Sequence, residues 1–388
     1  MKVLVICQYY YPEPFRLPDI CEELVRQGHN VTVVTGTPNY PMGEIYSGYE
    51  NGKKSDEVLN GVKIHRCKTA PRKTGTLNRL KNYFSYPASS RKYVKTLPND
   101  FDVVFVNQLS PVVMAEAGIW YKKKYNKKLV LYCLDLWPES LCVGGMKKDS
   151  VIYNIFKQLS KRIYRNAEEI LITSCSFRTY LKDMFDISDE KISYLPQYAE
   201  AQFLGLREKV QGEVFNLLFA GNIGTAQNVD TIIDAAKMLQ NEKACFHIVG
   251  DGIELENLKK QADGLSNVIF YGRKPLEKMP QYYEMADAML VTLTDDPIIS
   301  LTLPGKVQTY MAAGKPIVGA INGETALVLQ DAQGGYCGQA GDSKALAENI
   351  VKLMQSGQVA EIGKKNREYY INTFSKEQFM GEFVKHLN

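Results

Sequence analysis

Short runs of aliphatic and β-branched residues alternate along the chain with segments in which apolar residues recur every three or four positions. Five runs in the first half are predicted to be buried parallel strands: Val3–Ile6, Val31–Thr35, Val103–Val106, Leu129–Cys133 and Ile170–Thr173. Between the first two runs, apolar residues share one helical face: Leu17, Ile20, Cys21, Leu24 and Val25. Gly28 follows where this helix should end, and a strand, a helix and a parallel strand in this order form a right-handed crossover.

The same pattern begins again after Pro196. A second set of strands is predicted at Phe215–Ala220, Cys245–Val249, Val268–Tyr271, Ala288–Leu293 and Pro316–Ala320. Another helical stripe follows the first of them: Val229, Ile232, Ile233, Ala236 and Leu239. We therefore expect an α/β protein of two doubly wound domains, residues 1–197 and 198–374, with a hinge near 197–213.

Open parallel sheets bind ligands beyond the carboxyl ends of their strands. Two facing domains of this kind predict a ligand site in the cleft between them. The fold class alone does not define the chemistry, so the function has to be argued from particular residues.

The 388-residue chain is 45% hydrophobic, which is enough for two domains that each have a core. Residues 1–200 hold 29 Lys and Arg against 21 Asp and Glu, a balance of +8, whereas the remainder holds 18 against 22, a balance of −4. The basic residues gather at 72–95, 122–128 and 157–165. Such segments suit a surface that faces phosphates or anionic lipid, and an ordinary solvated surface is the alternative.

The remaining composition restricts the function classes. No apolar stretch approaches the ~20 residues of a membrane-spanning helix, and Met1-Lys2 leads directly into a strand, so a cytoplasmic protein is expected. The eight cysteines form no C-x-x-C pair and the four histidines are far apart, which predicts reduced core thiols and no metal site or other cofactor. The first strand leads into Gln8-Tyr9-Tyr10-Tyr11-Pro12, not into G-x-G-x-x-G, which disfavours a nicotinamide oxidoreductase. Only the lysine clusters favour nucleic acid.

Two loops of the second half are candidates for phosphate binding. Gly221-Asn222-Ile223-Gly224 joins a predicted strand to a predicted helix, whose free N–H groups would suit a diphosphate. Lys306 follows Pro304-Gly305 in the first turn of another helix, where a cation opposes the dipole at a cost of about 0.3–1 kcal/mol. An anion between this lysine and the helix end would offset that cost, and Arg273 at the end of a strand could bind the same phosphates. Solvated side chains are the alternative for both cations.

Over essentially its whole length, the sequence resembles glycosyltransferase family 4, a large family of retaining enzymes. Within this family it is similar to the subgroup that builds bacterial capsule and O-antigen repeat units. The resemblance rests on six segments in this order: Tyr9-Tyr10-Tyr11-Pro12-Glu13-Pro14, residues 28–36 (GHNVTVVTG), Asp135-Leu136-Trp137-Pro138-Glu139-Ser140, Ala220-Gly221-Asn222-Ile223-Gly224, Val249-Gly250-Asp251-Gly252 and Pro304-Gly305-Lys306.

This resemblance implies the two-lobed GT-B fold, with two Rossmann-like domains facing across a cleft. The first domain, 1–197, would take the acceptor, and the second, 198–374, the nucleotide sugar. A final helix within 375–388, with Phe379, Phe383 and Leu387 as its apolar stripe, would return to pack on the first domain. The expected activity is transfer of a hexosyl or N-acetylhexosaminyl group, without a metal, from a nucleotide-diphosphate sugar, UDP-sugar above all. The acceptor would be a glycan or a glycan linked to a polyprenyl diphosphate.

The site expected from the residues and the resemblance together has three parts. The catalytic group comprises Lys306, Arg273 and Asp135. Donor binding is assigned to Gly221, Asn222, Gly224, Gly250, Asp251, Pro304, Gly305, Glu324 and Thr325, where Glu324 opens a helix and can accept two ribose hydroxyls. Acceptor binding is assigned to Arg16, Trp137 and Glu139. Structural roles are the alternatives for Arg16 and Glu324.

The sequence departs from the family pattern at three places. The two family glutamates separated by seven residues fall at Leu301 and Thr309, which have no carboxylate. The family arginine and lysine of the second domain correspond to Asn222 and Gln227, and the glycine-rich first loop appears as Pro14-Phe15-Arg16. A catalytically degenerate partner subunit that binds a nucleotide therefore stays open as an alternative function, as does a sugar-nucleotide epimerase.

One aromatic segment indicates a partner of a different kind. Tyr83, Phe84 and Tyr86 are interleaved with basic residues, namely Arg79, Lys81, Arg91 and Lys92. An amphipathic segment of this composition could rest on the anionic inner leaflet of the plasma membrane, and ordinary core aromatics are the alternative.

Overall fold

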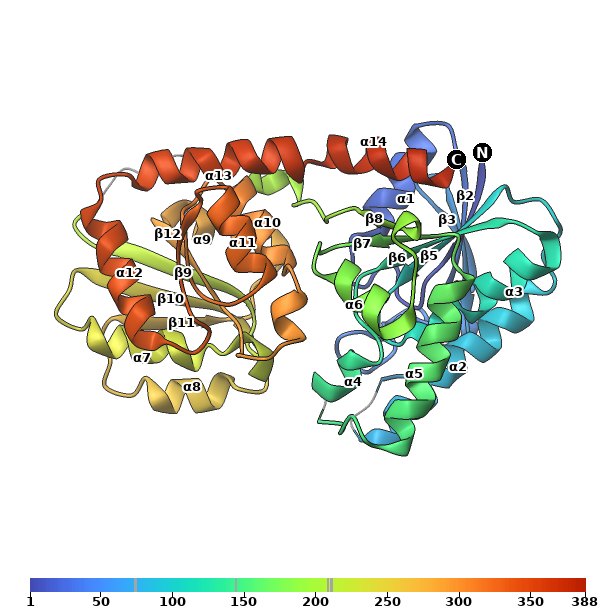
Figure 1. Ribbon diagram of the computed structural model, residues 1–388, viewed down its shortest axis with the longest axis horizontal. Coiled ribbons are helices and arrows are strands. Elements are labelled where there is room, and N and C mark those ends of the chain that lie inside the picture. The colour runs from blue at the N-terminus through green and yellow to red at the C-terminus, as the bar shows by residue number, and fades with distance from the viewer. Residues whose placement is uncertain (73–74, 144, 208, 210–211) are drawn as a thin grey trace. The chain divides into compact units, whose positions relative to one another are not determined.

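The computed structural model describes residues 1–72, 75–143, 145–207, 209 and 212–388. The described chain forms two compact units, which we treat separately (Figure 1). Unit 1 comprises Met1–Thr173, Phe177–Leu195 and Met380–Asn388, and unit 2 comprises Ser174–Ser176 and Pro196–Phe379. Some residues of the predicted basic segment and hinge lie outside the described residues: Lys73, Thr74, Glu208, Val210 and Gln211.

Unit 1 is built on an eight-stranded sheet in the order β3-β4-β2-β1-β5-β6-β7-β8. Every neighbouring pair is parallel except the edge pair β3 and β4. All five predicted strands are present because their side chains are buried on both faces of the sheet. The strands are β1 (Lys2–Ile6), β2 (Asn30–Gly36), β3 (Asp56–Leu59), β4 (Val62–Cys67), β5 (Val103–Gln108), β6 (Lys128–Cys133), β7 (Glu169–Ile172) and β8 (Ile192–Tyr194).

Strands β3, β4 and β8 were not predicted. β3 alternates between exposed and half-buried positions and the first part of β4 between buried and more exposed ones, as expected near a sheet edge, so neither has a continuous apolar run. They form a hairpin around Asn60 and Gly61, which both have positive φ angles. An Asn-Gly pair between alternating strands is a strong hairpin signal, so this element could have been found.

The helices of unit 1 are α1 (Leu17–Arg26), α2 (Thr76–Val94), α3 (Glu116–Tyr125), α4 (Glu139–Val143), α5 (Val151–Asn166) and α6 (Phe177–Phe185). Tyr83 and Tyr86 on α2 are buried, whereas Phe84 is 48% exposed. The expectation that both tyrosines face a membrane is therefore wrong, and the alternative of core aromatics is correct for them. None of the helices in the described part of the chain combines the length and the hydropathy needed to cross a membrane.

The final helix, α14 (Lys376–Leu387), has the predicted bounds, and its residues from Met380 onward belong to unit 1. Phe383 is buried against Phe105 of β5, with ring centroids 4.7 Å apart. His386 lies 2.5 Å from a carboxylate oxygen of Glu169 on β7. The last turns of the chain thus complete the core of a unit that begins at its first residue.

Unit 2 is built on a six-stranded, wholly parallel sheet in the order β11-β10-β9-β12-β13-β14. Its strands are β9 (Phe215–Asn222), β10 (Ala244–Asp251), β11 (Val268–Gly272), β12 (Ala288–Thr292), β13 (Ile317–Ala320) and β14 (Gly335–Gly338). The five predicted strands of this half are present, and β14 is additional. Its glycine-rich sequence, Gly335-Tyr336-Cys337-Gly338, lacks the apolar run on which the prediction depended.

Helices cover both faces of this second sheet. On one face, α7, α8 and α12 bury an apolar cluster with Phe219, Phe246 and Leu290. On the other, Tyr283 of α9 packs against Tyr310 of α10, whose hydroxyl bonds to the backbone of Ala220. The helices are α7 (Asp230–Met238), α8 (Leu255–Gln261), α9 (Met279–Met285), α10 (Gly305–Ala312), α11 (Glu324–Asp331), α12 (Ser343–Gln355) and α13 (Val359–Thr373).

A substitution at Gly250 tests the closest backbone contact of this sheet. A Cβ atom at Gly250 would lie 1.8 Å from the carbonyl oxygen of Gly221, so Gly250→Ala should lower the free energy of unfolding by about 1–3 kcal/mol. Gly381→Ala is the control, because nothing lies within 4 Å of its added methyl group and alanine is favoured in a helix by about 1 kcal/mol. Chemical denaturation of both variants makes the comparison. Equal stability of Gly250→Ala and the native chain would show that the backbones do not approach this closely.

Candidate functional site

The carboxyl ends of β9 and β10 lie side by side and expose bare backbone. Gly221 is in register with Gly250, and Asn222 with Asp251. The N–H of Ile223 donates to the carbonyl oxygen of Asp251 at 2.9 Å, which ties the loop after β9 to the end of β10. Gly250 permits this approach because a Cβ atom there would meet the carbonyl oxygen of Gly221, while a Cβ atom on Gly221 would meet Lys306. The structure thus brings together four of the residues predicted to bind the donor.

The loop after β9 does not lead directly into a helix, so that part of the prediction is wrong. A 3-10 turn, Thr225–Gln227, follows Gly224, and α7 begins only at Asp230. The side-chain oxygen of Gln227 accepts from the amide of Asn222 at 3.1 Å and from the N–H of Gly224 at 3.2 Å. The glutamine at the position of the family lysine therefore shapes the loop and brings no charge to it.

Lys306 points from α10 to the edge of the sheet. Its ammonium nitrogen lies 3.9 Å from the centroid of the Phe219 ring, and a Cβ atom on Gly221 would be 2.8 Å from it. The residue as a whole is half-buried, but the nitrogen itself is buried and has no hydrogen-bond partner among the described residues. Lys306 thus lies against the same glycine that the sequence places in the donor site.

Burial lowers the pKa of Lys306 to about 7, because the charged ammonium loses water without gaining a hydrogen bond or an anionic partner in the described part of the chain. Contact with the π-face of Phe219 returns only part of that cost. A negatively charged ligand at this edge would supply the missing partner and restore the charge. The geometry is therefore that of an incomplete anion site.

Arg273 follows β11 and is more exposed than Lys306. Its Nε lies 3.9 Å from a carboxylate oxygen of Asp251, at the end of the neighbouring strand, and both side chains are at least half exposed. An exposed ion pair of this length holds neither group firmly. Arg273 therefore lies at the carboxyl end of β11, the end of the sheet that was predicted. It is two strands away from β9, which Lys306 contacts.

Glu324 is the first residue of α11 and is almost completely buried. One carboxylate oxygen accepts the N–H of Cys175 at 2.8 Å, and the other accepts the N–H and hydroxyl of Ser176 at 3.0 and 2.5 Å. The neighbouring Thr325 donates its hydroxyl to the carbonyl of Thr302 at 3.2 Å. Both side chains are thus already engaged within unit 2, and their predicted role toward the nucleotide stays a prediction.

The positions of the absent family glutamates have structural roles. Thr309 is buried and donates its hydroxyl to the carbonyl of Gly305 one turn earlier in α10, where Pro304 is the N-cap residue. The carbonyl of Leu301 accepts the hydroxyl of Ser174. At both positions the bonds made are local to unit 2.

In unit 1, Ser110 connects two of the predicted residues. Its hydroxyl donates to Asp135 at 2.8 Å and accepts from the indole N–H of Trp137 at 2.9 Å. Burial raises the pKa of Asp135, and the hydrogen bonds from Ser110 and the charge of Arg72 oppose that shift. Trp137 is fully buried, so it supports the position of Asp135 from behind.

The other two predicted acceptor residues have different surroundings. Glu139 is fully buried and accepts the hydroxyls of Tyr153 at 2.8 Å and Tyr180 at 3.3 Å, with Lys148 3.2 Å away. Arg16 lies at the start of α1, close enough to oppose the rise in pKa that burial causes at Tyr132. Neither arrangement tests an acceptor role, which stays a prediction for both.

Sequence reasoning missed Arg72 and Glu13 at this edge of the first sheet. The charge of Arg72 opposes the rise in pKa that burial causes at Tyr9, which follows β1, and at Asp135, which follows β6. Glu13 accepts three backbone N–H groups, from Tyr10, Asn39 and Tyr40, yet burial outweighs these bonds and raises its pKa to about 7. Glu13 lies in the first quoted motif, but its role in folding the loop could not be read from the motif.

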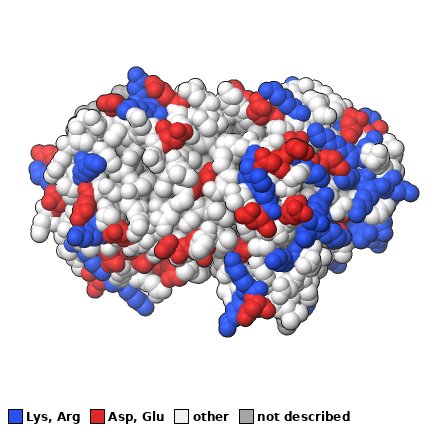
Figure 2. Space-filling view, in the orientation of Figure 1, with Lys and Arg blue, Asp and Glu red and all other residues white. Residues whose placement is uncertain are grey.

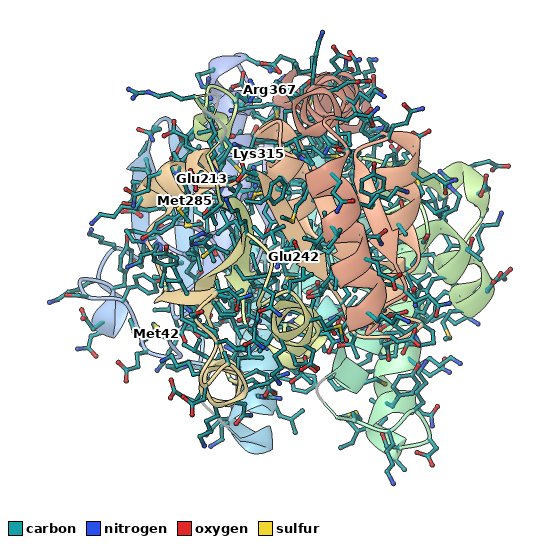
Figure 3. The ribbon with its side chains drawn as sticks, turned by 90° about the vertical axis from the view of Figure 1, so that its left-hand side faces the viewer. Met42, Glu213, Glu242, Met285, Lys315 and Arg367 are labelled. Atoms are coloured by element: carbon teal, nitrogen blue, oxygen red, sulfur yellow. The ribbon has the colours of Figure 1, made fainter. Side chains whose placement is uncertain are left out.

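A pocket of about 670 Å³ lies at the other end of the second sheet, where the strands begin. Lys315 and Arg367 line it, and Figure 3 labels both. Lys315 precedes β13 and donates to the carbonyl of Ala286, and Asp287, also in the lining, precedes β12 and pairs with Lys209. These residues lie at the amino ends of the strands, so the pocket is separate from the edge that carries Lys306. Among the described residues, no group of three His, Cys, Asp or Glu side chains could hold a metal ion.

Two tandem Rossmann-like units, each built on a mainly parallel sheet covered by helices, are the architecture of the GT-B fold. Residues 17–198 match the family model described as "Glycosyltransferase Family 4", and residues 214–356 match "Glycosyl transferases group 1". The two models together span most of the chain, which therefore belongs to glycosyltransferase family 4.

Curated relatives agree with this assignment, and a solved structure agrees with the fold. The chain is 29% identical to WbjE of Pseudomonas aeruginosa, named as a probable glycosyltransferase, over 59% of this chain and 60% of that protein. It is 24% identical to WcaI of Escherichia coli K12, named as a glycosyl transferase of colanic acid biosynthesis, over 99% of both chains. The UDP complex of Anabaena HepE has a TM-score of 0.73 at 15% identity and covers 100% of this chain and 99% of its own.

The pH dependence of stability tests the burial of Lys306. A lysine pKa lowered in the folded state destabilises the fold fully below about pH 7, and this effect disappears as the pH rises toward the unfolded value of 10.5. Lys306→Met should therefore stabilise the ligand-free protein at pH 6, by on the order of 1 kcal/mol, and by progressively less toward pH 10. Denaturation curves at several pH values measure this. A stability difference that does not change with pH would mean that the ammonium is solvated.

Proposed function

We propose that the protein is a retaining glycosyltransferase of bacterial surface polysaccharide synthesis that takes a UDP-sugar as its donor. The names of WbjE and WcaI and the membership of family 4 support the class of reaction. HepE structures of similar fold contain UDP or UDP-glucose, which supports the choice of nucleotide. The acceptor is a glycan or a glycan on a polyprenyl diphosphate, and transfer requires no metal.

One observation carries this proposal: the Lys306 ammonium is buried beside Gly221 without an anionic partner among the described residues. A pyrophosphate that leaves a sugar develops negative charge, and a preorganised cation in a site of low dielectric stabilises that charge strongly. Lys306 would bind the pyrophosphate of the donor and stabilise it further as the bond to the sugar breaks. Arg273 would add a second, more mobile cation.

In the proposed chemical step the donor supplies both the leaving group and the group that accepts the proton. The bond between the anomeric carbon and the pyrophosphate oxygen breaks, and its electron pair stays with the nucleoside diphosphate. The acceptor hydroxyl attacks the resulting oxocarbenium-like carbon from the same face, and its proton passes to a donor phosphate oxygen. Asp135 is proposed to orient the acceptor hydroxyl, since its carboxylate is held in place by Ser110.

The proposed location follows from the acceptor. A polyprenyl-diphosphate-linked glycan lies at the inner face of the plasma membrane, so the enzyme would act in the cytoplasm and contact that membrane at its periphery. The basic balance of residues 1–200 supports this partner, because anionic lipid attracts Lys and Arg. In Figure 2 the Lys and Arg atoms are densest over unit 1.

Replacement of Lys306 tests the proposed catalytic role. Lys306→Met keeps an unbranched apolar side chain close to the length of the lysine stem but removes the ammonium group. We expect UDP to bind about tenfold more weakly or worse, and transfer from UDP-sugar to fall by at least about 100-fold. Calorimetry and a transfer assay with the purified chain measure these two effects.

Lys260→Met is the matched control, because Lys260 is exposed at the end of α8. It should leave both binding and transfer unchanged. Full turnover by Lys306→Met would refute the role of Lys306. Native protein that binds UDP without transfer or hydrolysis of any UDP-sugar would instead identify a degenerate binding subunit.

UDP affinity should also depend on pH in a defined direction. Above about pH 7 the free Lys306 is neutral, so binding of the diphosphate must take up a proton. Affinity should therefore fall between pH 7 and 9, by up to about tenfold per pH unit, whereas Lys306→Met should show a flat profile. Parallel profiles for both proteins would contradict the assignment.

A further inference from the structure

Four large apolar side chains are exposed together on unit 1. Val151, Ile152 and Ile155, in the first two turns of α5, are 75%, 40% and 54% exposed, and Phe84 of α2 is 48% exposed. Val151 and Ile155 are four residues apart and so share one side of the helix. We refer to these four residues as the α5 patch. Contiguous apolar surface of this kind marks an interaction site more often than do single exposed residues.

Stacked aromatic rings hold the two helices of the α5 patch together. Phe84 stacks on Phe156 with ring centroids 6.0 Å apart, and Phe156 packs edge-on against Trp137 at 5.3 Å. Tyr83 contacts the other side of Trp137 at 5.7 Å. Since Ile152 and Phe156 lie one turn apart on α5, the exposed phenyl ring of Phe84 and the exposed aliphatic side chains are neighbours on a rigid base.

The surroundings of the α5 patch are strongly basic. Residues 147–166 contain one acid, Asp149, and six cations: Lys147, Lys148, Lys157, Lys161, Arg162 and Arg165. Residues 76–94 of α2 contain four cations and no acid. Lys148 is held near Glu139, Arg162 near Glu116 and Arg165 near Asp186. Lys81 and Lys147 are exposed, and they precede Phe84 by three residues and Val151 by four. In Figure 2 uncharged atoms cover much of the lowest projection of unit 1, with Lys and Arg atoms and one group of Asp or Glu atoms along its margin.

We infer that the α5 patch is the surface by which the protein binds a bilayer that contains anionic lipid. Apolar side chains would enter the boundary between headgroups and acyl chains, while the lysines around them contact lipid phosphates. The charge favours this occupant, because a bilayer with anionic lipid offers phosphate charge at its surface and an apolar interior directly beneath it. The inference rests on the proposed function only for its biological purpose, since binding to a bilayer needs no turnover.

Vesicle binding by the full chain tests the inference. The native protein should sediment with vesicles of phosphatidylcholine and phosphatidylglycerol and remain in solution with phosphatidylcholine alone. The double variant Val151→Ser/Ile155→Ser should lose at least about tenfold in partition coefficient. Lys81→Glu/Lys147→Glu should lose about fivefold or more per lysine, as expected for lysines near an anionic surface.

Matched variants outside the α5 patch show whether the loss of any exposed apolar or basic side chain weakens binding to vesicles. Val58→Ser/Ile371→Ser removes the same residue types at 68% and 50% exposure and should bind as the native chain does. Lys123→Glu/Lys124→Glu changes the basic end of α3, which lies outside the α5 patch, and should weaken binding less than the Lys81 and Lys147 pair. Circular dichroism and thermal unfolding check that each variant is folded.

The outcomes divide cleanly. No binding of the native chain to anionic vesicles, or equal binding by Val151→Ser/Ile155→Ser, would overturn the inference. So would a loss confined to Lys123→Glu/Lys124→Glu, which would move the contact to α3. UDP affinity, measured in parallel, should be unchanged in all these variants, so failure of the membrane surface and failure of the donor site can be told apart.

Discussion

The position of one ammonium group, that of Lys306 against Gly221, connects the fold of unit 2 to its chemistry. A buried cation without a counter-ion is costly, and proteins usually avoid the cost by pairing the group or by losing the proton. Here the nitrogen lies at the carboxyl edge of a parallel sheet, where the strands end in bare glycine backbone. The pKa of about 7 means that the group is close to the balance between its two states, which a bound anion would tip toward the charged one.

The glycines at the carboxyl ends of β9 and β10 shape the proposed ligand site together with Lys306. A Cβ atom on Gly250 would collide with the carbonyl oxygen of Gly221, and one on Gly221 would meet the Lys306 side chain. The two glycines thus leave room for the strand pairing and for Lys306, beside the exposed side chains of Asn222 and Asp251. Gln227 stabilises the loop above them without bringing charge, so the positive charge at this end of the sheet comes from Lys306 and, more exposed, from Arg273. Since Lys306 has a pKa of about 7, the charge of the proposed site would depend on pH near neutrality.

Much of the fold could be predicted because its strands are buried on both faces. Val3–Ile6 and Val103–Val106 carry continuous apolar runs and were found, whereas β3 and β14 lack such runs and were missed. The position of Lys306 in a first helical turn predicted a phosphate contact, but its burial depends on Phe219 and Gly221, more than 80 residues away in sequence. The bonds of Glu324 to Cys175 and Ser176 span a still longer separation and had no sequence signal. Local sequence patterns predict helices and strands, whereas contacts between distant segments decide which side chains remain available to a ligand.

The same limit explains why the sequence left two roles open for the aromatic residues of α2, of which Tyr83 and Tyr86 are in the core and Phe84 is exposed, and their packing has a consequence for unit 1. Tyr83, Trp137, Phe156 and Phe84 form one continuous stack from the core to the surface. Trp137 also holds Ser110, and Ser110 holds Asp135. A close-packed chain of rings deforms little, so it fixes the distance between Asp135 and the α5 patch. If that patch rests on a bilayer, Asp135 lies at a set height above it, and only acceptors whose reactive hydroxyl reaches that height can be aligned.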